Sequence, residues 1–242
     1  MNAYGAWQLT AVVAASVITL AALARGRLLG SRALLAVLVA GVGGLIGARL
    51  LKVAFHLAEA REDSSLVWSL DFRGLDMAGV VLGGALAGGL LATSMKLPMA
   101  RLAKAAIPGL AVGMSISKVG CWVAGCCFGS VYEGLGAVPV ERFSDAHLAQ
   151  IWAGVVSPFG SPKTVFPVQL LEILIPLAAL VFWLRFKREP LAFLAAYGVL
   201  KAGVTFLRFP DAAGNPPIVH LALYFAPVAM LILASARPSA DS

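Results

Sequence analysis

Several ionisable side chains of this 242-residue sequence lie inside long apolar segments, where charge is costly. Such groups are rare within a bilayer unless they are paired or hydrated, so each one is a candidate functional residue. Arginine and lysine bind phosphate oxygens through charge-assisted hydrogen bonds. The residue types therefore predict a cationic site for an anionic headgroup, with one carboxylate among the cations. The candidates are Arg49, Lys52, Lys118, Glu172 and Lys201, with Asp76 and Arg208 at the segment edges.

The spacing of these residues places several of them on shared helical faces. Residues three or four positions apart lie on the same side of an α-helix. Two inward-facing polar faces would line a basic, water-accessible cavity, whereas single groups could instead extend to the membrane interface. The two sets are Arg49, Lys52 and His56, and Lys201, Thr205 and Arg208.

The three cysteines of the chain fall within one short segment, at Cys121, Cys126 and Cys127. They could pack as small apolar side chains, or one thiol beside Lys118 could act as a nucleophile or acceptor. A disulfide between Cys121 and Cys126 requires Gly125 to end the helix, because residues five apart on a continuous helix are rotated by about 140°. The pattern C-x4-C-C without nearby histidines lacks the usual spacing of metal ligands, so we expect no metal and no cofactor.

The composition identifies the elements that must position these groups. The chain is 60% hydrophobic and 13% charged, whereas soluble proteins are about a quarter charged. Its apolar runs approach the length of a membrane helix and are apolar on all sides, unlike the alternating strands of a β-barrel. The net charge of +7 does not indicate nucleic-acid binding, because the charges form no basic stripe with aromatic residues.

The sequence predicts an all-α, polytopic membrane protein with a bundle of seven transmembrane helices, forming a single integral membrane domain over residues 1–242. We expect the first helix to be retained, because no basic residue precedes it as in a signal peptide. The loop region at 127–166 is expected to pack onto the bundle or the membrane surface. The predicted spans are 7–24, 33–57, 76–95, 106–126, 167–184, 190–207 and 217–235.

Loop charges predict the orientation of the bundle. The loops after the first, third and fifth spans carry a net charge of +8, whereas the loops at 58–76 and 127–166 together carry −4. Cytoplasmic loops are enriched in lysine and arginine, so we expect the amino terminus to be extracytoplasmic and the carboxyl terminus to be cytoplasmic. The candidate charged residues then all lie on the extracytoplasmic side.

The segment around the cysteines resembles the signature of the prolipoprotein diacylglyceryl transferase family, G-R-x-G-N-F-x-N-x-E-x-x-G. Two of the three glycines of this signature are present, as Gly120 and Gly129. The polar positions differ, with Lys118 at the arginine, Cys121 and Ala124 at the two asparagines, and Cys126 at the glutamate.

Four further blocks resemble the family in the same order along the chain. In the second of them Ala78 stands at the family's histidine, and in the last Lys201 stands at its arginine. The blocks are 47–50 with Arg49 (G-x-R-L), 74–84 (G-L-S-F-H-G-G), 166–172 with Gln169 and Glu172 (H-P-S-Q-L-Y-E), and 197–201 followed by Arg208 (Y-G-x-x-R).

The resemblance implies transfer of diacylglyceryl from phosphatidylglycerol, or a related anionic phospholipid, to a lipobox cysteine thiol, in the lipid bilayer of the bacterial inner membrane. The prolipoprotein lipobox peptide is then the acceptor partner. The leaving glycerol phosphate needs cations and the thiol needs a base, and Glu172 is either that base or the partner of a lysine. Expected catalytic residues are Lys118, Cys121, Cys126, Glu172 and Lys201, and expected substrate-binding residues are Arg49, Gly120, Gly129, Gln169 and Arg208.

Two other functions fit the same residues. A divergent paralogue could use another phospholipid or acceptor, with a cysteine taking part in the chemistry. A non-catalytic lipid-binding membrane subunit could keep the fold after losing the histidine and both asparagines. Single cysteine substitutions test the first alternative, and lipid co-purification without turnover would indicate the second.

Overall fold

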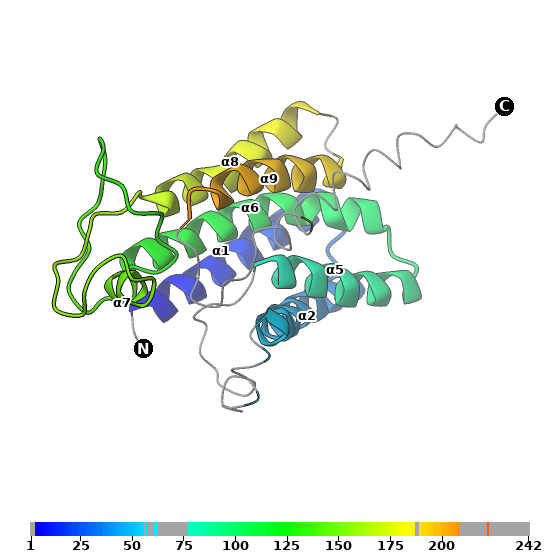
Figure 1. Cartoon of the computed structure of the whole chain (residues 1–242). Coiled ribbons are helices and arrows are strands. Elements are labelled where there is room, and N and C mark those ends of the chain that lie inside the picture. The colour runs from blue at the N-terminus through cyan, green and yellow to red at the C-terminus, as the bar shows by residue number, and fades with distance from the viewer. Residues whose placement is uncertain are drawn as a thin grey trace. The chain divides into compact units, whose positions relative to one another are not determined.

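A computed structural model describes residues 3–55, 57, 61, 77–186, 189–208 and 222 of the chain. Within these residues the regular elements are all α-helices, with three isolated β-bridges and no strand, so the all-α prediction is confirmed. The helices, labelled in Figure 1, are α1 (Ala3–Arg25), α2 (Ser31–Phe55), α5 (Met77–Ser94), α6 (Met99–Val123), α7 (Asp145–Trp152), α8 (Val168–Arg185) and α9 (Pro190–Thr205).

Four of the described helices are long and apolar enough to cross a membrane, namely α1, α2, α6 and α8. Two more, α5 and α9, are apolar but shorter. The predicted span 217–235 lies outside the described residues except at position 222, and most of the acidic loop 58–76 lies outside them as well. The seven-span topology therefore stays a prediction.

The boundaries of α6 differ from the predicted span of 106–126. The helix begins at Met99, directly after Pro98, whose carbonyl oxygen accepts a hydrogen bond from Arg101 N–H at 3.0 Å. Arg101 and Lys104 thus lie on the first turns of the helix instead of in a loop. Long cationic side chains at a helix end can extend to the membrane interface, so their charge did not mark the boundary of the helix.

Packing divides the described residues into two compact units, and the division falls within α1 and α6. One unit spans residues 15–110, and within it α2 and α5 lie side by side (Figure 1). Glycines bring these two backbones together. A Cβ atom at Gly83 would lie 2.8 Å from Gly47 Cα, and one at Gly79 would lie 2.7 Å from Ala48 Cα. The expected role of small residues in close helix packing is confirmed for this pair.

The other unit comprises residues 1–14 and 111–242, and within it α8 packs against α9. The loop region 127–166 contains the short helix α7, which is not among the elements expected from the sequence. Ser144 caps α7 by accepting a hydrogen bond from His147 N–H. The Gln150 side chain donates to Lys163 O at 2.8 Å and accepts from Lys163 N–H at 2.9 Å. These polar contacts give the loop region an ordered structure of its own.

Backbone hydrogen bonds join the start of this loop region to the residues just before α8 and just after α9. Gly129 N–H donates to Phe166 O at 3.1 Å, and Ser130 N–H donates to Leu207 O at 2.9 Å. A Cβ atom at Gly129 would collide with Phe166 O, so the close approach of these segments depends on glycine. An isolated bridge between Gly129 and Arg208 fixes the chain after α6 next to the chain after α9.

Candidate active site

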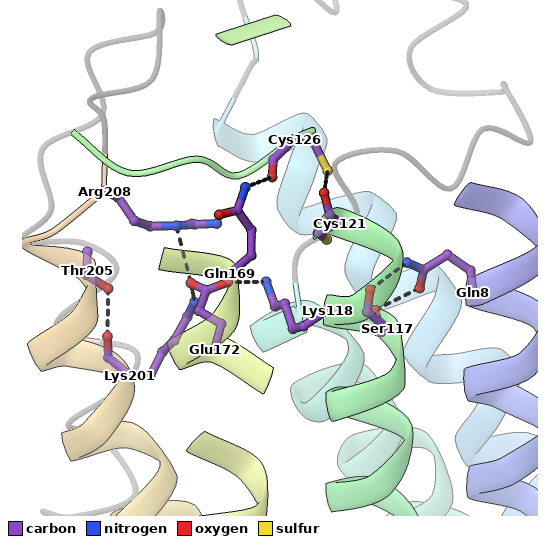
Figure 2. A network of polar contacts seen from close by, with 10 residues as sticks. All are labelled: Gln8, Ser117, Lys118, Cys121, Cys126, Gln169, Glu172, Lys201, Thr205 and Arg208. Atoms are coloured by element: carbon purple, nitrogen blue, oxygen red, sulfur yellow. Dashed lines mark hydrogen bonds and ion pairs between the residues drawn. The ribbon is translucent and has the colours of Figure 1, made fainter. Parts of the chain in front are cut away.

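Glu172, near the start of α8, lies at the centre of a buried cluster of charges. Its side chain is only 1% exposed. Lys118 Nζ lies 2.8 Å from Glu172 Oε2, and Arg208 Nε lies 3.3 Å from Oε1. Lys201 Nζ also contacts Oε1, as both an ion pair and a hydrogen bond. Figure 2 shows the three cations converging on this one carboxylate.

The cations reach Glu172 on α8 from two other parts of the fold. Lys118 lies in the last part of α6, and Lys201 lies in the second half of α9. Arg208 follows the end of α9, where Ser130 Oγ donates a hydrogen bond to Arg208 O at 3.0 Å. Within α9, Thr205 Oγ1 donates to Lys201 O at 2.9 Å. Three segments that are distant in sequence therefore meet at one point.

The cluster has more positive than negative charge, because three cations surround one carboxylate. Buried charges are stable when they are paired and hydrogen-bonded, so this surplus favours an added anion. The side chain of Lys201 is 5% exposed, whereas those of Lys118 and Arg208 are 13% and 27% exposed. Lys118 and Arg208 are thus the cations that an incoming anion can reach.

The cysteine segment, residues 121–127, includes the end of α6 at Val123 and the residues that follow it. Gly125 adopts the left-handed conformation with φ +66°. Gly125 N–H donates to Trp122 O at 3.2 Å, and Cys126 N–H donates to Cys121 O at 3.1 Å. This pair of bonds is a Schellman motif, which ends a helix at glycine and brings the following residue back over the last turn. Gly125 therefore ends the helix, which is the condition for a close approach of Cys121 and Cys126.

The sulfur atoms of all three cysteines gather at this helix end. The Sγ atoms of Cys121, Cys126 and Cys127 lie within 4.8 Å of one another, and the three thiols are free, with no disulfide among them. Cys127 also has a left-handed conformation, with φ +59°. Hydrogen bonds from the Cys121 and Cys126 thiols, with the charges of Lys118 and Arg208, lower the pKa of the Cys127 thiol well below its usual range.

Gln169 connects the cysteine segment to α8. Its Nε2 atom donates a hydrogen bond to Cys126 O at 2.9 Å, and the residue is 5% exposed. This hydrogen bond holds the backbone of the cysteine segment, and the role of Gln169 in substrate binding stays a prediction. Gln169 lies three residues before Glu172, so one turn of α8 supports both the charge cluster and the cysteine segment (Figure 2).

The first part of α1 packs against the last part of α6. Gln8 Oε1 accepts a hydrogen bond from Ser117 Oγ at 2.8 Å, and Gln8 Nε2 donates to Ser117 O at 3.2 Å. A Cβ atom at Gly120 would lie 2.8 Å from Trp7 Cβ, so this glycine allows the two helices to approach. Gln8 is not among the residues expected at the site, although a lone amide in the first apolar run was a signal for it.

The predicted site residues are distributed over both units. Every predicted site residue except Arg49 lies in the unit that contains α8 and α9. Arg49 lies on α2, in the unit spanning residues 15–110, and its role at the site stays a prediction. His56 and Asp76 lie outside the described residues. Cys127 is a member of the sulfur cluster that was not predicted as a site residue, although its place next to Cys126 was a signal for it.

The match to a known family covers almost the whole chain. A family model for prolipoprotein diacylglyceryl transferase matches residues 1–236. The chain belongs to this family. Its members are transferases that move diacylglyceryl groups to prolipoproteins in lipoprotein maturation, and membership together with the apolar helices indicates a bacterial membrane protein. No individual curated protein matches the chain.

This member of the prolipoprotein diacylglyceryl transferase family combines two kinds of chemistry in one unit. The cations around Glu172 provide binding for an anionic group. The thiols at the end of α6 and just after it provide soft, polarisable sulfur ligands or nucleophiles. Both features occur where the sequence resembles the family blocks, and Cys121 and Cys126 stand at the first asparagine and the glutamate of the family signature.

Proposed function

We propose that this family member transfers the diacylglyceryl group of phosphatidylglycerol to the thiol of a lipobox cysteine in a prolipoprotein. The cysteine sulfur bonds to the glyceryl carbon that carries the phosphate, and the bond from that carbon to the phosphate oxygen breaks. Glycerol phosphate leaves with the bonding electrons, and the thiol proton passes to a base or to solvent. The observation that carries the proposal is the convergence of Lys118, Lys201 and Arg208 on Glu172.

The cations match the charge that develops in this reaction. Negative charge grows on the phosphate oxygen as its bond to carbon breaks, and cations that are already in place stabilise it without rearrangement. Lys118 and Arg208 are partly exposed, so they would contact the phosphate directly. Lys201 is more deeply buried, so its positive charge would stabilise the phosphate without direct contact.

Glu172 acts in this proposal as a positioning residue. Both of its carboxylate oxygens are in ion pairs, with Lys118 at Oε2 and with Lys201 and Arg208 at Oε1. A carboxylate that is surrounded by three cations is stabilised in its charged form, which makes it a weak base. Its function is to hold three mutually repelling cations together before the lipid binds.

The proposal also includes seven transmembrane helices with the amino terminus and the active site on the extracytoplasmic side. The loop charges of +8 and −4 support this orientation. The distribution of charge along the helices supports the same orientation, because α6 has Arg101 and Lys104 in its first turns and Lys118 towards its other end. Similarly, α8 carries Glu172 near its start and Arg185 in its last turn. The basic ends and the charge cluster therefore lie at opposite ends of each helix.

A direct assay tests the proposal. The full-length chain is purified into nanodiscs that contain phosphatidylglycerol and is supplied with a synthetic lipobox peptide, and the thioether product is measured by mass spectrometry. We expect product in these discs, and no product in phosphatidylethanolamine discs or with a peptide that has serine in place of the lipobox cysteine. A family enzyme of demonstrated activity serves as the positive control.

Two outcomes of the assay contradict the proposal. If the positive control forms product and this chain forms none, the chain does not catalyse the family reaction under these conditions. If phosphatidylglycerol co-purifies with the chain and is never consumed, the chain is a lipid-binding subunit. Rescue of a bacterium that lacks its own diacylglyceryl transferase provides the matching test in cells.

A further inference from the structure

The three thiols at the end of α6 and just after it form a cluster that the transfer described above does not use. Their sulfur atoms lie within 4.8 Å of one another, and the charges of Lys118 and Arg208 act on Cys127. The transfer also needs a group that activates the acceptor thiol, and Glu172 is engaged by three cations. The thiol cluster is therefore close to the place where activation is needed.

We propose that Cys121, Cys126 and Cys127 bind a zinc ion through three thiolates, and that the fourth coordination position of this ion accepts the acceptor thiol. Catalytic zinc sites have three protein ligands and one open position. A thiol that coordinates zinc gives up its proton, so the ion would activate the acceptor sulfur without a basic side chain. The inference rests on the proposed function for the identity of the acceptor.

The sulfur positions are close to those that a zinc ion requires. Zinc–sulfur bonds of about 2.3 Å place the sulfurs of a tetrahedral site about 3.8 Å apart. The three sulfurs already lie within 4.8 Å of one another. Small side-chain rotations therefore bring them to bonding distance from a single ion.

The backbone holds the cysteines in this arrangement. Cys121 lies in the last turn of α6, and the Schellman motif at Gly125 returns Cys126 to it. Gln169 fixes the Cys126 carbonyl oxygen. Cys127 has φ +59°, a conformation that is unfavourable for a residue with a Cβ atom and is normally occupied by glycine or asparagine.

The local charge also fits a metal–thiolate centre. A zinc ion with three thiolates has a net charge of −1. The positive charges of Lys118 and Arg208, which act on Cys127, would offset this negative charge. A disulfide would use only two of the three cysteines and would leave the third sulfur without a function. A three-thiolate zinc site uses all three.

The proposed step balances in atoms and charge. The acceptor thiol releases its proton to water as its sulfur binds the fourth position of the zinc ion. That sulfur then forms the new bond to the glyceryl carbon, and glycerol phosphate leaves with the electrons of the broken carbon–oxygen bond. The resulting thioether is a weaker ligand than a thiolate, so the product can dissociate and the site is regenerated.

Metal analysis of the full-length chain in nanodiscs tests the site itself. After removal of any affinity tag, we expect about one equivalent of zinc per chain and strong ultraviolet thiolate-to-metal bands when cobalt(II) replaces zinc. Cobalt spectra are used because zinc has no visible absorption. Absence of bound zinc after reconstitution, selective binding of copper(I) instead of zinc, or a thiol count that reveals a disulfide would overturn the proposal.

Cysteine variants locate the ligands. We expect Cys126→Ser and Cys127→Ser each to weaken zinc binding by about 10-fold or more, because each removes one ligand. Both residues are half-buried, so these variants serve the test even if Cys121→Ser, at a buried position, fails to fold. The matched control is Ser157→Ala, in an exposed part of the loop region, which should bind zinc as the unchanged chain does. Undiminished binding in all the cysteine variants would overturn the assignment.

A peptide titration tests the open position without requiring activity. A lipobox peptide with its cysteine should shift the cobalt spectrum towards four thiolates, and a peptide with serine at that position should not. If neither peptide changes the spectrum, the fourth position does not bind the acceptor thiol. If the cysteine peptide shifts the spectrum but no thioether forms, the zinc site stands and the proposed transferase function fails. Thioether formed at an undiminished rate by metal-free chain leaves that function intact and overturns the zinc site.

Discussion

The charge cluster and the cysteine segment lie in the same unit but are built in different ways. The cluster joins residues from α6, α8 and the end of α9, up to 90 positions apart, around one buried carboxylate. The cysteine segment spans seven residues and is shaped by a backbone motif at Gly125. The first depends on correct packing of helices, whereas the second depends mainly on local conformation. Substitution of the shared carboxylate should therefore affect folding and activity together, whereas substitutions of single cations or in the cysteine segment should affect folding less.

The largest expected effect is that of Glu172→Gln. This change leaves three neighbouring cations without a counter-charge, and breaking a buried ion pair from one side costs about 3–5 kcal/mol. We expect a clear fall in thermal stability in nanodiscs and loss of thioether formation. The exposed change Glu133→Gln is the control for loss of a carboxylate and should leave both unaltered. Equal thermal stability of the two variants would mean that the ion pairs of Glu172 do not stabilise the fold.

Removal of a single cation should affect activity more than folding. Lys118→Ala and Lys201→Ala each remove one charge from a group that has a positive surplus, so we expect activity to fall by about 100-fold with a smaller change in stability. Activity is measured as thioether formation from phosphatidylglycerol. Lys163→Ala, at an exposed position of the loop region, is the matched control. Full activity in both cluster variants would show that the cations do not bind the phosphate.

The connection between the two regions is tested by Gly129→Ala. The added methyl group would collide with Phe166 O and come within 3.0 Å of Leu207 O, which should displace Arg208 from Glu172. We expect about a 10-fold fall in activity, consistent with misplacement of a catalytic group by a fraction of an ångström. Gly203→Ala, on α9, meets no atom within 4 Å and should retain activity. Equal activity of these two glycine variants would show that activity does not depend on the position of Arg208.

The smallest expected effect is that of Gln169→Ala. It removes one hydrogen bond to Cys126 O, worth about 1 kcal/mol, and leaves the cations in place. We expect faster alkylation of the cysteines by a maleimide, with only a small loss of overall stability. Gln150→Ala, in α7, removes two side-chain-to-backbone hydrogen bonds to Lys163 and should leave the alkylation rate unaltered. The same alkylation rate in both variants would show that Gln169 does not order the cysteine segment.

Much of the helical fold followed from hydropathy alone, because a run of apolar residues on all sides has no stable alternative in a bilayer. The start of α6 did not follow, since Arg101 and Lys104 extend the helix in place of ending it. Helix α7 was not predicted because it is short and owes its stability to contacts such as that of Gln150 with Lys163, which no periodicity reveals. Patterns of apolar residues report the environment of a helix, and they do not report side-chain contacts.

The sequence by itself determined which residues at the site carry charge, and it placed three cysteines within seven residues, with Gly125 between Cys121 and Cys126. Both follow from residue type and short-range spacing. Only the tertiary structure decided that Lys118, Lys201 and Arg208 share one carboxylate, and that Gln169 holds the cysteine segment. The physical reason is that ion pairs and hydrogen bonds form over about 3 Å, and residues far apart in a chain reach that distance only when the helices that carry them pack together.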